Sequence, residues 1–231
     1  KKLQSKLAEK DIDGALIIHH TNMFYFSGTS QNGFLFIPQK GDPVLMIKRS
    51  FNRAKLESPI ENIVELKSPK LIVETLEAKG FTLHKLALEL DMIPYNTVLY
   101  YQKVLQKELI DVSGLTKQIR IIKSDYEIGL LKKACGALDS NFADVPAMVQ
   151  IGMTEVELAG KFEAGLRKRG YGGCSKMHAF NQDFFMGNIV TGPSGAAATY
   201  FDGPVGGTGV TPANNPHGAG WRTIQKNDII Y

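Results

Sequence analysis

The chain has 231 residues, of which 43% are hydrophobic and 22% charged, so it can bury one or two hydrophobic cores and is not a disordered tail. Its formal net charge is +4, and no basic block is long enough to follow a phosphate backbone, so nucleic acid is not an expected partner. No apolar run approaches the roughly 18 residues that span a bilayer, and the start lacks a signal peptide's hydrophobic stretch, so we expect no membrane partner.

The first half alternates short apolar runs with amphipathic stretches, which is typical of an α/β layer structure. Turn residues at 38–42 predict a hairpin between the strands on either side, and therefore a mixed sheet. Runs rich in β-branched and aromatic residues predict strands at 14–18, 33–37, 43–47 and 85–89. Amphipathic stretches predict helices at 2–10, 69–79 and 94–105.

The second half begins with two amphipathic helices. Apolar residues recur every three or four positions over 128–145, which predicts one long helix that Pro146 ends or kinks. A second helix is predicted over 154–169, followed by Gly170, where left-handed caps are common. Each helix starts with a capping box, in which two side chains satisfy unpaired backbone N–H groups. The boxes are Ser124 with Glu127 and Thr154 with Glu157.

Glycine is distributed unevenly along the chain. Residues 1–118 hold 6 of the 23 glycines and residues 119–231 hold the other 17, nine of them within 187–220. This shift predicts two domains with a boundary near residue 118. Residues 228–231 predict a strand that has only begun, so we expect the chain to stop inside a structural element. Because the first residue is not Met, we also expect some N-terminal sequence to be absent.

A local search for an active site finds no strong pattern. No histidine has a carboxylate or second His at the spacing that places zinc ligands on one helix face. His19 and His20 are interpreted as polar residues at a strand end. The glycine-rich stretch 203–209 is followed by residues that cannot propagate a helix, so it predicts a loop and not a nucleotide-binding turn. The loop either lines a substrate or lies on the surface.

The two cysteines support neither a disulfide framework nor a cysteine enzyme. Cys135 lies on the apolar stripe of the long predicted helix and is expected in the core. Cys174 has no nearby His in the sequence to activate a thiolate. A reducing cytoplasm is the expected location. Trp221 and the aromatic residues 24–26 are expected to be packing residues.

Several blocks of sequence resemble the creatinase, prolidase and aminopeptidase P family. Residues 21–29 (TNMFYFSGT) are similar to the Asn-aromatic-Ser-Gly signature of its N-terminal domain. Three later blocks are similar, in the same order, to the start of its C-terminal pita-bread domain: 119–135, 152–167 and 189–193. The resemblance implies an α/β (α+β) protein, with a creatinase-type mixed-sheet domain over 1–118 and the first half of a pita-bread domain over 119–231.

The resemblance also implies an activity. It indicates a cytoplasmic, homodimeric Xaa-Pro metallopeptidase of the aminopeptidase P or prolidase type, which hydrolyses the bond before proline in a peptide or dipeptide. Family members use two bridged divalent cations, often manganese or cobalt, to activate water. Their first metal-binding Asp follows the strand that residues 228–231 represent, so no metal ligand is assigned here. Asp228 itself resembles a turn residue, and we expect the 231 residues alone to be inactive.

One catalytic residue is assigned by the resemblance. Many peptidase members carry a Pro-His pair ahead of this strand, whose His contacts the substrate or the oxyanion, and Pro216-His217 stands at nearly that place. The spacing from His217 to Asp228 is one residue short, and the glycine-rich stretch before it departs from the usual connection. His217 is therefore either a catalytic residue or a surface-loop residue.

Two other functions stay open. The fold also serves as a peptide-binding or chaperone module without peptidase chemistry, and the glycine-rich insert favours this alternative. A metal-free, creatinase-like C–N hydrolase would need His217 as general base, and the sequence shows no clear guanidinium-binding group to accompany it. Because half of a pita-bread domain lacks its other half, we expect apolar faces and strand edges in 119–231 to be exposed.

Overall fold

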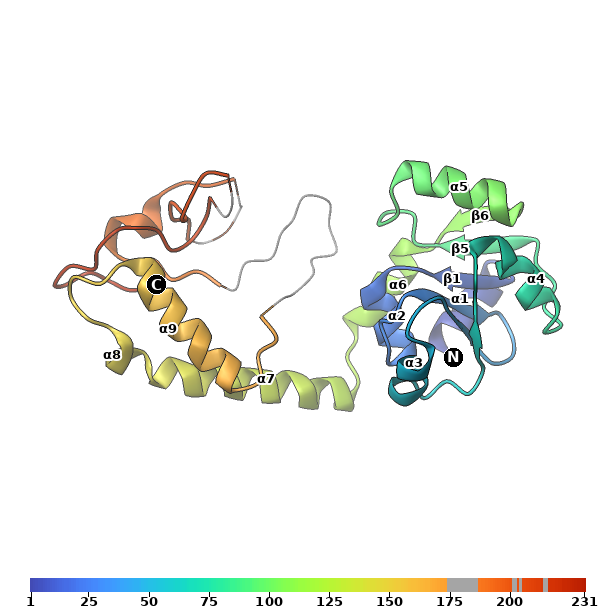
Figure 1. Cartoon of the computed structure of the whole chain (residues 1–231), viewed down its shortest axis with the longest axis horizontal. Coiled ribbons are helices and arrows are strands. Elements are labelled where there is room, and N and C mark those ends of the chain that lie inside the picture. Colours follow the sequence, from blue (N-terminus) through green and yellow to red (C-terminus); the bar gives the residue numbers. More distant parts are fainter. Residues whose placement is uncertain (174–186, 201–202, 204, 214–215) are drawn as a thin grey trace. The chain divides into compact units, whose positions relative to one another are not determined.

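The computed structural model describes residues 1–173, 187–200, 203, 205–213 and 216–231. The chain divides into two compact units, Lys1–Ile122 and Lys123–Tyr231. The first unit is a sheet with helices, and the second consists of helices followed by irregular chain (Figure 1). Within the described ranges, no helix is both long and apolar enough to cross a membrane.

The first unit is built on six strands. They are β1 (Gly14–Ile17), β2 (Gly33–Pro38), β3 (Val44–Ile47), β4 (Ile63–Glu65), β5 (Lys85–Leu88) and β6 (Glu108–Asp111). The strand order is β4-β3-β2-β1-β5-β6. β2 pairs antiparallel with both β1 and β3, whereas the other three pairs are parallel. The predicted hairpin and the predicted mixed sheet are therefore confirmed.

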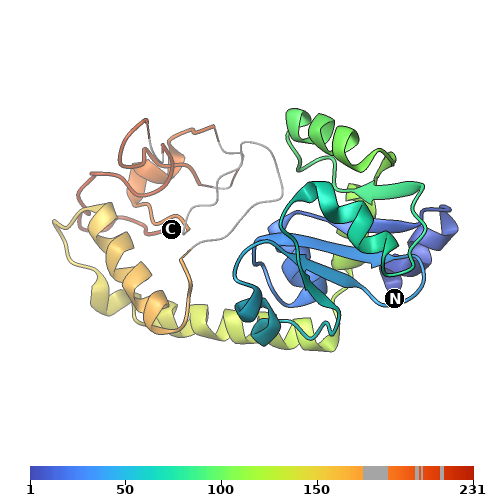
Figure 2. The ribbon, with the colours of Figure 1, turned by 45° about the vertical axis from the view of Figure 1, so that its right-hand side comes forward.

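Helices cover both faces of this sheet (Figure 2). Ala15 and Ile17 of β1 join one core, whereas Leu16 between them joins the other, as alternating strand residues do. Because both faces are buried, the strands are continuous apolar runs, which is why four of them can be recognised in the sequence. The first core contains residues of α1 (Lys2–Glu9), α2 (His20–Ser27), α3 (Phe51–Glu57) and α6 (Ser113–Ile121). The second contains residues of α4 (Ile72–Glu77), which follows the 3-10 turn η1 (Pro69–Leu71), and of α5 (Tyr95–Leu105).

Five elements of the first unit are not predicted from the sequence: α2, α3, β4, β6 and α6. β4 and β6 are short edge strands whose side chains stay partly or fully exposed, so they lack the apolar runs of the central strands. The buried residues of α2 include Asn22 and Ser27, which interrupt an apolar stripe. The interpretation of His19 and His20 as a strand end is wrong, because His19 is the N-cap of α2 and His20 is its first residue.

A buried carboxylate holds α2 against the sheet. Glu89 is fully buried just after β5, and its Oε2 accepts hydrogen bonds of 3.3 and 3.1 Å from the backbone N–H groups of residues 18 and 19. The Asn22 side chain donates to the other oxygen of Glu89 and accepts a 2.7 Å hydrogen bond from Arg120 of α6. Since a buried charge needs donors around it, the polar signature in 21–29 supports the fold of this unit.

The second unit contains α7 (Asp125–Ala143), α8 (Val145–Met148) and α9 (Glu155–Lys168), followed by irregular chain with the 3-10 turn η2 (Gly192–Ala196). Both predicted capping boxes are present, and α7 ends just before Pro146 as predicted. Gly170 has the expected positive φ, at +93°. Residues 228–231 make only a short pairing, in which Tyr231 and Val190 exchange backbone hydrogen bonds of 2.9 and 3.3 Å.

The apolar stripe of α7 is largely exposed. Leu131 and Phe142 expose 52% and 62% of their surfaces, and Cys135 is a free, exposed cysteine. The expected burial of Cys135 is therefore wrong. The physical reason is that the described part of this unit has only a small core, centred on Met153, Leu158 and Ile224, which does not reach along α7. The expected exposure of apolar faces in this half is found.

The two cores of the first unit predict which leucines contribute to its free energy of unfolding. Leu16 is fully buried in β1, whereas Leu56 of α3 is 88% exposed. We expect Leu16→Ala to lower the free energy of unfolding of this unit by about 2–5 kcal/mol, because it leaves a cavity. The control Leu56→Ala should stay within about 0.5 kcal/mol of the wild type. Native-state hydrogen exchange at the β1 and β5 amides in increasing urea measures both, and a loss below about 1 kcal/mol for Leu16→Ala would contradict the prediction.

Candidate functional site

His217 lies in irregular chain of the second unit and is only 2% exposed, so the surface-loop alternative is wrong. Its Nε2 lies 2.5 Å from Asn188 Nδ2, and its Nδ1 lies 3.0 Å from Thr199 Oγ1. Because an amide nitrogen donates, Nε2 accepts and the ring proton sits on Nδ1, facing the Thr199 hydroxyl. Burial lowers the pKa of the imidazole below its ordinary value of 6.5, so the ring is neutral at pH 7.

Glycines let three backbone segments pack together beside His217. Gly218 donates a 3.0 Å hydrogen bond to the Gly206 carbonyl. A Cβ at Gly206 would lie 1.6 Å from the Ala197 carbonyl oxygen, and Gly207 has φ +104°. No side chain other than glycine's hydrogen fits the first position, and the second favours glycine by its backbone angle. No helix begins within the described residues 205–213, so the predicted loop is confirmed.

A buried carboxylate joins the segments on both sides of His217. Glu155, the first residue of α9, is fully buried. Its Oε1 accepts hydrogen bonds from the Thr191 backbone N–H at 2.7 Å and from the Thr191 hydroxyl at 2.9 Å. Its Oε2 accepts a 3.1 Å hydrogen bond from the Gly220 backbone N–H. The carboxylate therefore has a donor at each oxygen, as its burial requires.

An ion pair extends this network. Arg222 donates two hydrogen bonds to Asp228, of 2.5 and 3.0 Å, in the two-point geometry that favours Arg–carboxylate pairs. Arg222 also donates to the Thr191 hydroxyl at 2.6 Å. The guanidinium holds the pKa of Asp228 below its ordinary value, with help from the Gln225 backbone N–H. Asp228 is therefore the partner of an arginine.

The described carboxylates do not fit a pair of divalent cations. Within the described ranges, no three or more His, Cys, Asp or Glu side chains come together as metal ligands. Glu155 points its oxygens at N–H and O–H donors, and Asp228 points its oxygens at a guanidinium and a backbone N–H. A carboxylate surrounded by donors offers no space for a cation. No catalytic step through a metal is therefore derived from these residues.

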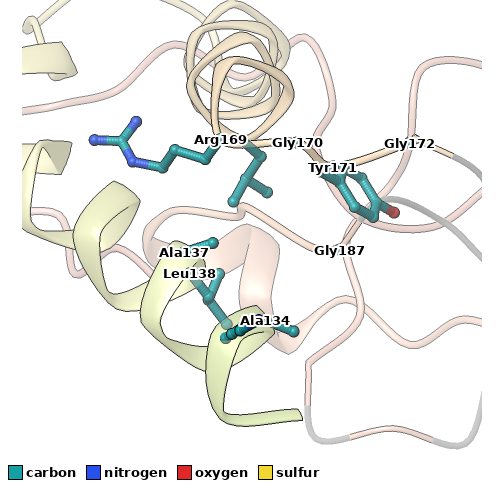
Figure 3. A pocket seen from close by; sticks show the side chains of 10 residues that line it. Ala134, Ala137, Leu138, Arg169, Gly170, Tyr171, Gly172 and Gly187 are labelled. Carbon is teal, nitrogen blue, oxygen red and sulfur yellow. The ribbon is translucent and has the colours of Figure 1, made fainter. Parts of the chain in front are cut away.

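A cavity of about 510 Å³ lies between α7 and the end of α9 (Figure 3). Ala134, Ala137 and Leu138 of α7 form one wall, and Tyr171 lies opposite. Arg169 extends away from the cavity and binds Asn141 and Asp144 through its guanidinium. The walls are thus mainly apolar, and one lining residue, Gly187, directly follows residues outside the described ranges. The cavity is not assigned as a site.

Sequence reasoning identifies His217 but misses the residues that surround it. Asn188, Thr199 and Glu155 lie 29, 18 and 62 positions away in the chain, and no local pattern links them to His217. The expectation that Trp221 is a packing residue is wrong, since it is 64% exposed and its indole N–H donates to the Val210 carbonyl at 3.0 Å. Phe24 is likewise 59% exposed. Cys174 lies outside the described residues.

Comparison of the sequence with family models identifies its N-terminal domain. Residues 1–122 match the model described as the creatinase/prolidase N-terminal domain. A protein named Xaa-Pro dipeptidase from Pyrococcus furiosus is 28% identical over 201 residues, which cover 86% of this chain and 55% of that protein. Uncharacterized peptidase YqhT of Bacillus subtilis is 28% identical over 174 residues, covering 74% and 49%. The chain spans about half the length of these relatives.

Solved structures share the fold. The Xaa-Pro dipeptidase from Bacillus anthracis matches 99% of this chain and 57% of its own, with a TM-score of 0.77 and 23% identity. The prolidase from Pyrococcus horikoshii matches 99% of this chain and 58% of its own, with a TM-score of 0.76 and 24% identity. Both likenesses extend through the second unit as well as the first, so the predicted fold class is confirmed.

The burial of His217 predicts a loss of stability in acid. An unfolded chain protonates this imidazole near pH 6.5, whereas the lowered pKa delays protonation in the folded protein. Between these two pKa values the unfolded state holds more protons than the folded state. The contribution of neutral His217 to the free energy of unfolding is therefore complete above about pH 6.5 and is lost as the pH falls to the folded pKa. We expect the amides of Gly209 and Gly218 to lose more protection between about pH 7.5 and pH 5.5 in the wild type than in His217→Gln, after correction for intrinsic exchange rates. Equal losses in the two proteins would contradict this.

Proposed function

The chain belongs to the creatinase/prolidase N-terminal domain family, and we propose that it is part of a Xaa-Pro peptidase of the aminopeptidase P or prolidase type. The observation that carries the proposal is the likeness to the Pyrococcus furiosus Xaa-Pro dipeptidase. That likeness spans 201 residues and so continues beyond the 122 residues of the N-terminal domain into the second unit. The proposed reaction is hydrolysis of the bond before proline in a peptide or dipeptide.

The proposal assigns different tasks to the two halves. Residues 1–118 form the creatinase-type domain, whose sheet is buried on both faces and carries no metal cluster among its residues. Residues 119–231 form the first half of a pita-bread domain and hold the candidate catalytic residue, His217. Support for this division comes from the two compact units of the chain and from the exposed stripe of α7, which has the apolar character of a surface that another layer would cover.

His217 is proposed to contact the reacting carbonyl or the developing oxyanion. A neutral imidazole can donate a hydrogen bond to such an oxygen without carrying a charge into a buried site. Both ring nitrogens already have partners, so His217 must exchange one of them to reach a substrate. Exchange at Nδ1 is the simpler route, because the proton that now faces the Thr199 hydroxyl would then face the substrate oxygen.

The proposed cofactors are two divalent cations, manganese or cobalt, as the resemblance implies. The described residues do not fit them, because the buried carboxylates of the second unit are occupied by donors. We therefore propose that the metal ligands are not among the described residues, and that the described residues alone are inactive. The proposed location is the cytoplasm, where the exposed thiol of Cys135 would stay reduced, and the proposed assembly is a homodimer.

A peptide-binding module without peptidase chemistry is the second candidate. The observation that favours it is the same donor-filled environment of Glu155 and Asp228, since a binding module needs no metal ligands. Its exposed aromatic residues, including Trp221 and Tyr200, offer flat surfaces of the kind that bind proline-rich segments. The two candidates make opposite predictions for turnover.

The first test is turnover of full-length protein on proline peptides. We expect hydrolysis of Ala-Pro or of a peptide beginning Ala-Pro in the presence of manganese or cobalt, and little hydrolysis of Ala-Ala. Removal of the metal with EDTA should lower the rate at least about 100-fold, because the cations activate the water, and added metal should restore it. Binding of proline peptides without any hydrolysis by metal-loaded protein would support the binding module instead.

The second test concerns His217. In full-length, metal-loaded protein, His217→Ala should lower kcat at least about 100-fold, because it removes a donor to the oxyanion. The circular dichroism spectrum provides a control for folding, and His84→Ala is a matched substitution at a histidine in the first unit. A near-wild-type kcat for His217→Ala in folded protein would remove His217 from the mechanism.

A further inference from the structure

Glu155 binds two backbone N–H groups, one three residues after Asn188 and the other three residues after His217. The Thr191 backbone N–H, which binds Oε1, lies three residues after Asn188. The Gly220 backbone N–H, which binds Oε2, lies three residues after His217. Asn188 and His217 are the two residues whose side chains meet at 2.5 Å. One buried carboxylate therefore fixes the backbone at the same distance along the chain from each member of the pair.

The segments that Glu155 joins are held otherwise by single backbone hydrogen bonds, such as the 3.2 Å bond from the Val156 N–H to the Gly220 carbonyl, and by isolated bridges. Neither 187–191 nor 216–220 belongs to a helix or a sheet, and the pairing between residues 191 and 230 is an isolated bridge. The glycines beside them add backbone contacts but no side chains that could lock a position. The carboxylate, in contrast, is attached to the first turn of α9, which is held by its capping box. A helix of 14 residues thus provides the rigid support for an irregular region.

We propose that Glu155 is a positioning residue, whose carboxylate sets the Asn188–His217 hydrogen bond and thereby the tautomer of the His217 imidazole. The Asn188 amide selects the Nδ1-protonated form only while it stays opposite Nε2. Loss of the carboxylate would remove the link that it makes between the Thr191 and Gly220 backbone N–H groups and let the Asn188 and His217 side chains separate. The positioning stands on the structure alone, whereas its consequence for turnover rests on the proposed function.

Arg222 orients the Thr191 hydroxyl toward Glu155. It reaches the same Thr191 hydroxyl that donates to Glu155, and it is held by Asp228. The hydroxyl therefore accepts from a cation and donates to an anion, which fixes its orientation. A glutamine at position 155 keeps the shape but replaces one acceptor oxygen with an NH₂ group, which would face a backbone N–H donor at Thr191 or Gly220.

The test compares Glu155→Gln with Glu157→Gln by NMR. Both changes neutralise a carboxylate in the first turn of α9, but Glu157 is exposed and binds Thr154 in the capping box. We expect Glu155→Gln to change the imidazole nitrogen shifts of His217, to raise its pKa toward the ordinary value, and to speed amide exchange at Thr191 and Gly220 at least about tenfold. Glu157→Gln should leave the His217 shifts as in the wild type. Unchanged His217 shifts in folded Glu155→Gln would overturn the proposal.

A wild-type measurement decides the case in which Glu155→Gln does not fold. If one carboxylate holds both amides, the protons of Thr191 and Gly220 should exchange through a common opening, with protection factors within about threefold of each other. Protection factors that differ more than about tenfold would overturn the proposal. Turnover separates it from the proposed function: an inactive wild type counts against the peptidase, whereas unaltered His217 signals in an inactive Glu155→Gln variant count against the positioning role.

Discussion

A carboxylate that is taken out of water has to be surrounded by hydrogen-bond donors, and both units of this protein are organised by that requirement. In the first unit Glu89 collects two backbone N–H groups and the Asn22 amide, which fixes α2 above the sheet. In the second unit Glu155 collects Thr191 and Gly220, which fixes the irregular chain around His217. The donors to Glu89 come from one segment that lies 67 to 71 positions from it in the chain. The two backbone donors to Glu155 come from separate segments, at residues 191 and 220, so each carboxylate joins parts of the chain that are distant in sequence.

The central part of the first unit can be predicted from the sequence because its sheet is buried on both faces. The four strands that the apolar runs predict are the four inner strands of the six, and each appears within one residue of its expected bounds. The edge strands β4 and β6 and the polar helix α2 are not predictable in this way, since their side chains are partly exposed or are polar and buried. In the second unit the capping boxes predict the start of both long helices, because the signal is local. Burial of Cys135 depends on which layer covers α7, and a periodic pattern contains no such information.

The candidate site, like the edge strands, is only partly predictable from the sequence. Resemblance to a family singles out His217, but its partners are not recognisable, because Asn188 and Thr199 are common polar residues in a region without periodicity. Glu155 cannot be recognised in the sequence for a different reason. The helix dipole favours an acidic residue in the first turn of any helix, so its presence there does not indicate a special role. Only its burial and its two backbone donors distinguish it from Glu157, two positions later in the same turn. The fold follows from patterns spread along the whole chain, whereas the site depends on a few residues that the fold brings together.

Trp221 gives the second unit an optical reporter. It is the single tryptophan of the chain, it is largely exposed, and its indole is tied to the Val210 carbonyl at 3.0 Å. It also follows Gly220, one of the two amides that Glu155 binds. Tryptophan fluorescence from this chain, excited selectively over its eight tyrosines, therefore originates at one point beside the glycine-rich segment. A change in emission wavelength or anisotropy would register movement of that segment without any attached dye.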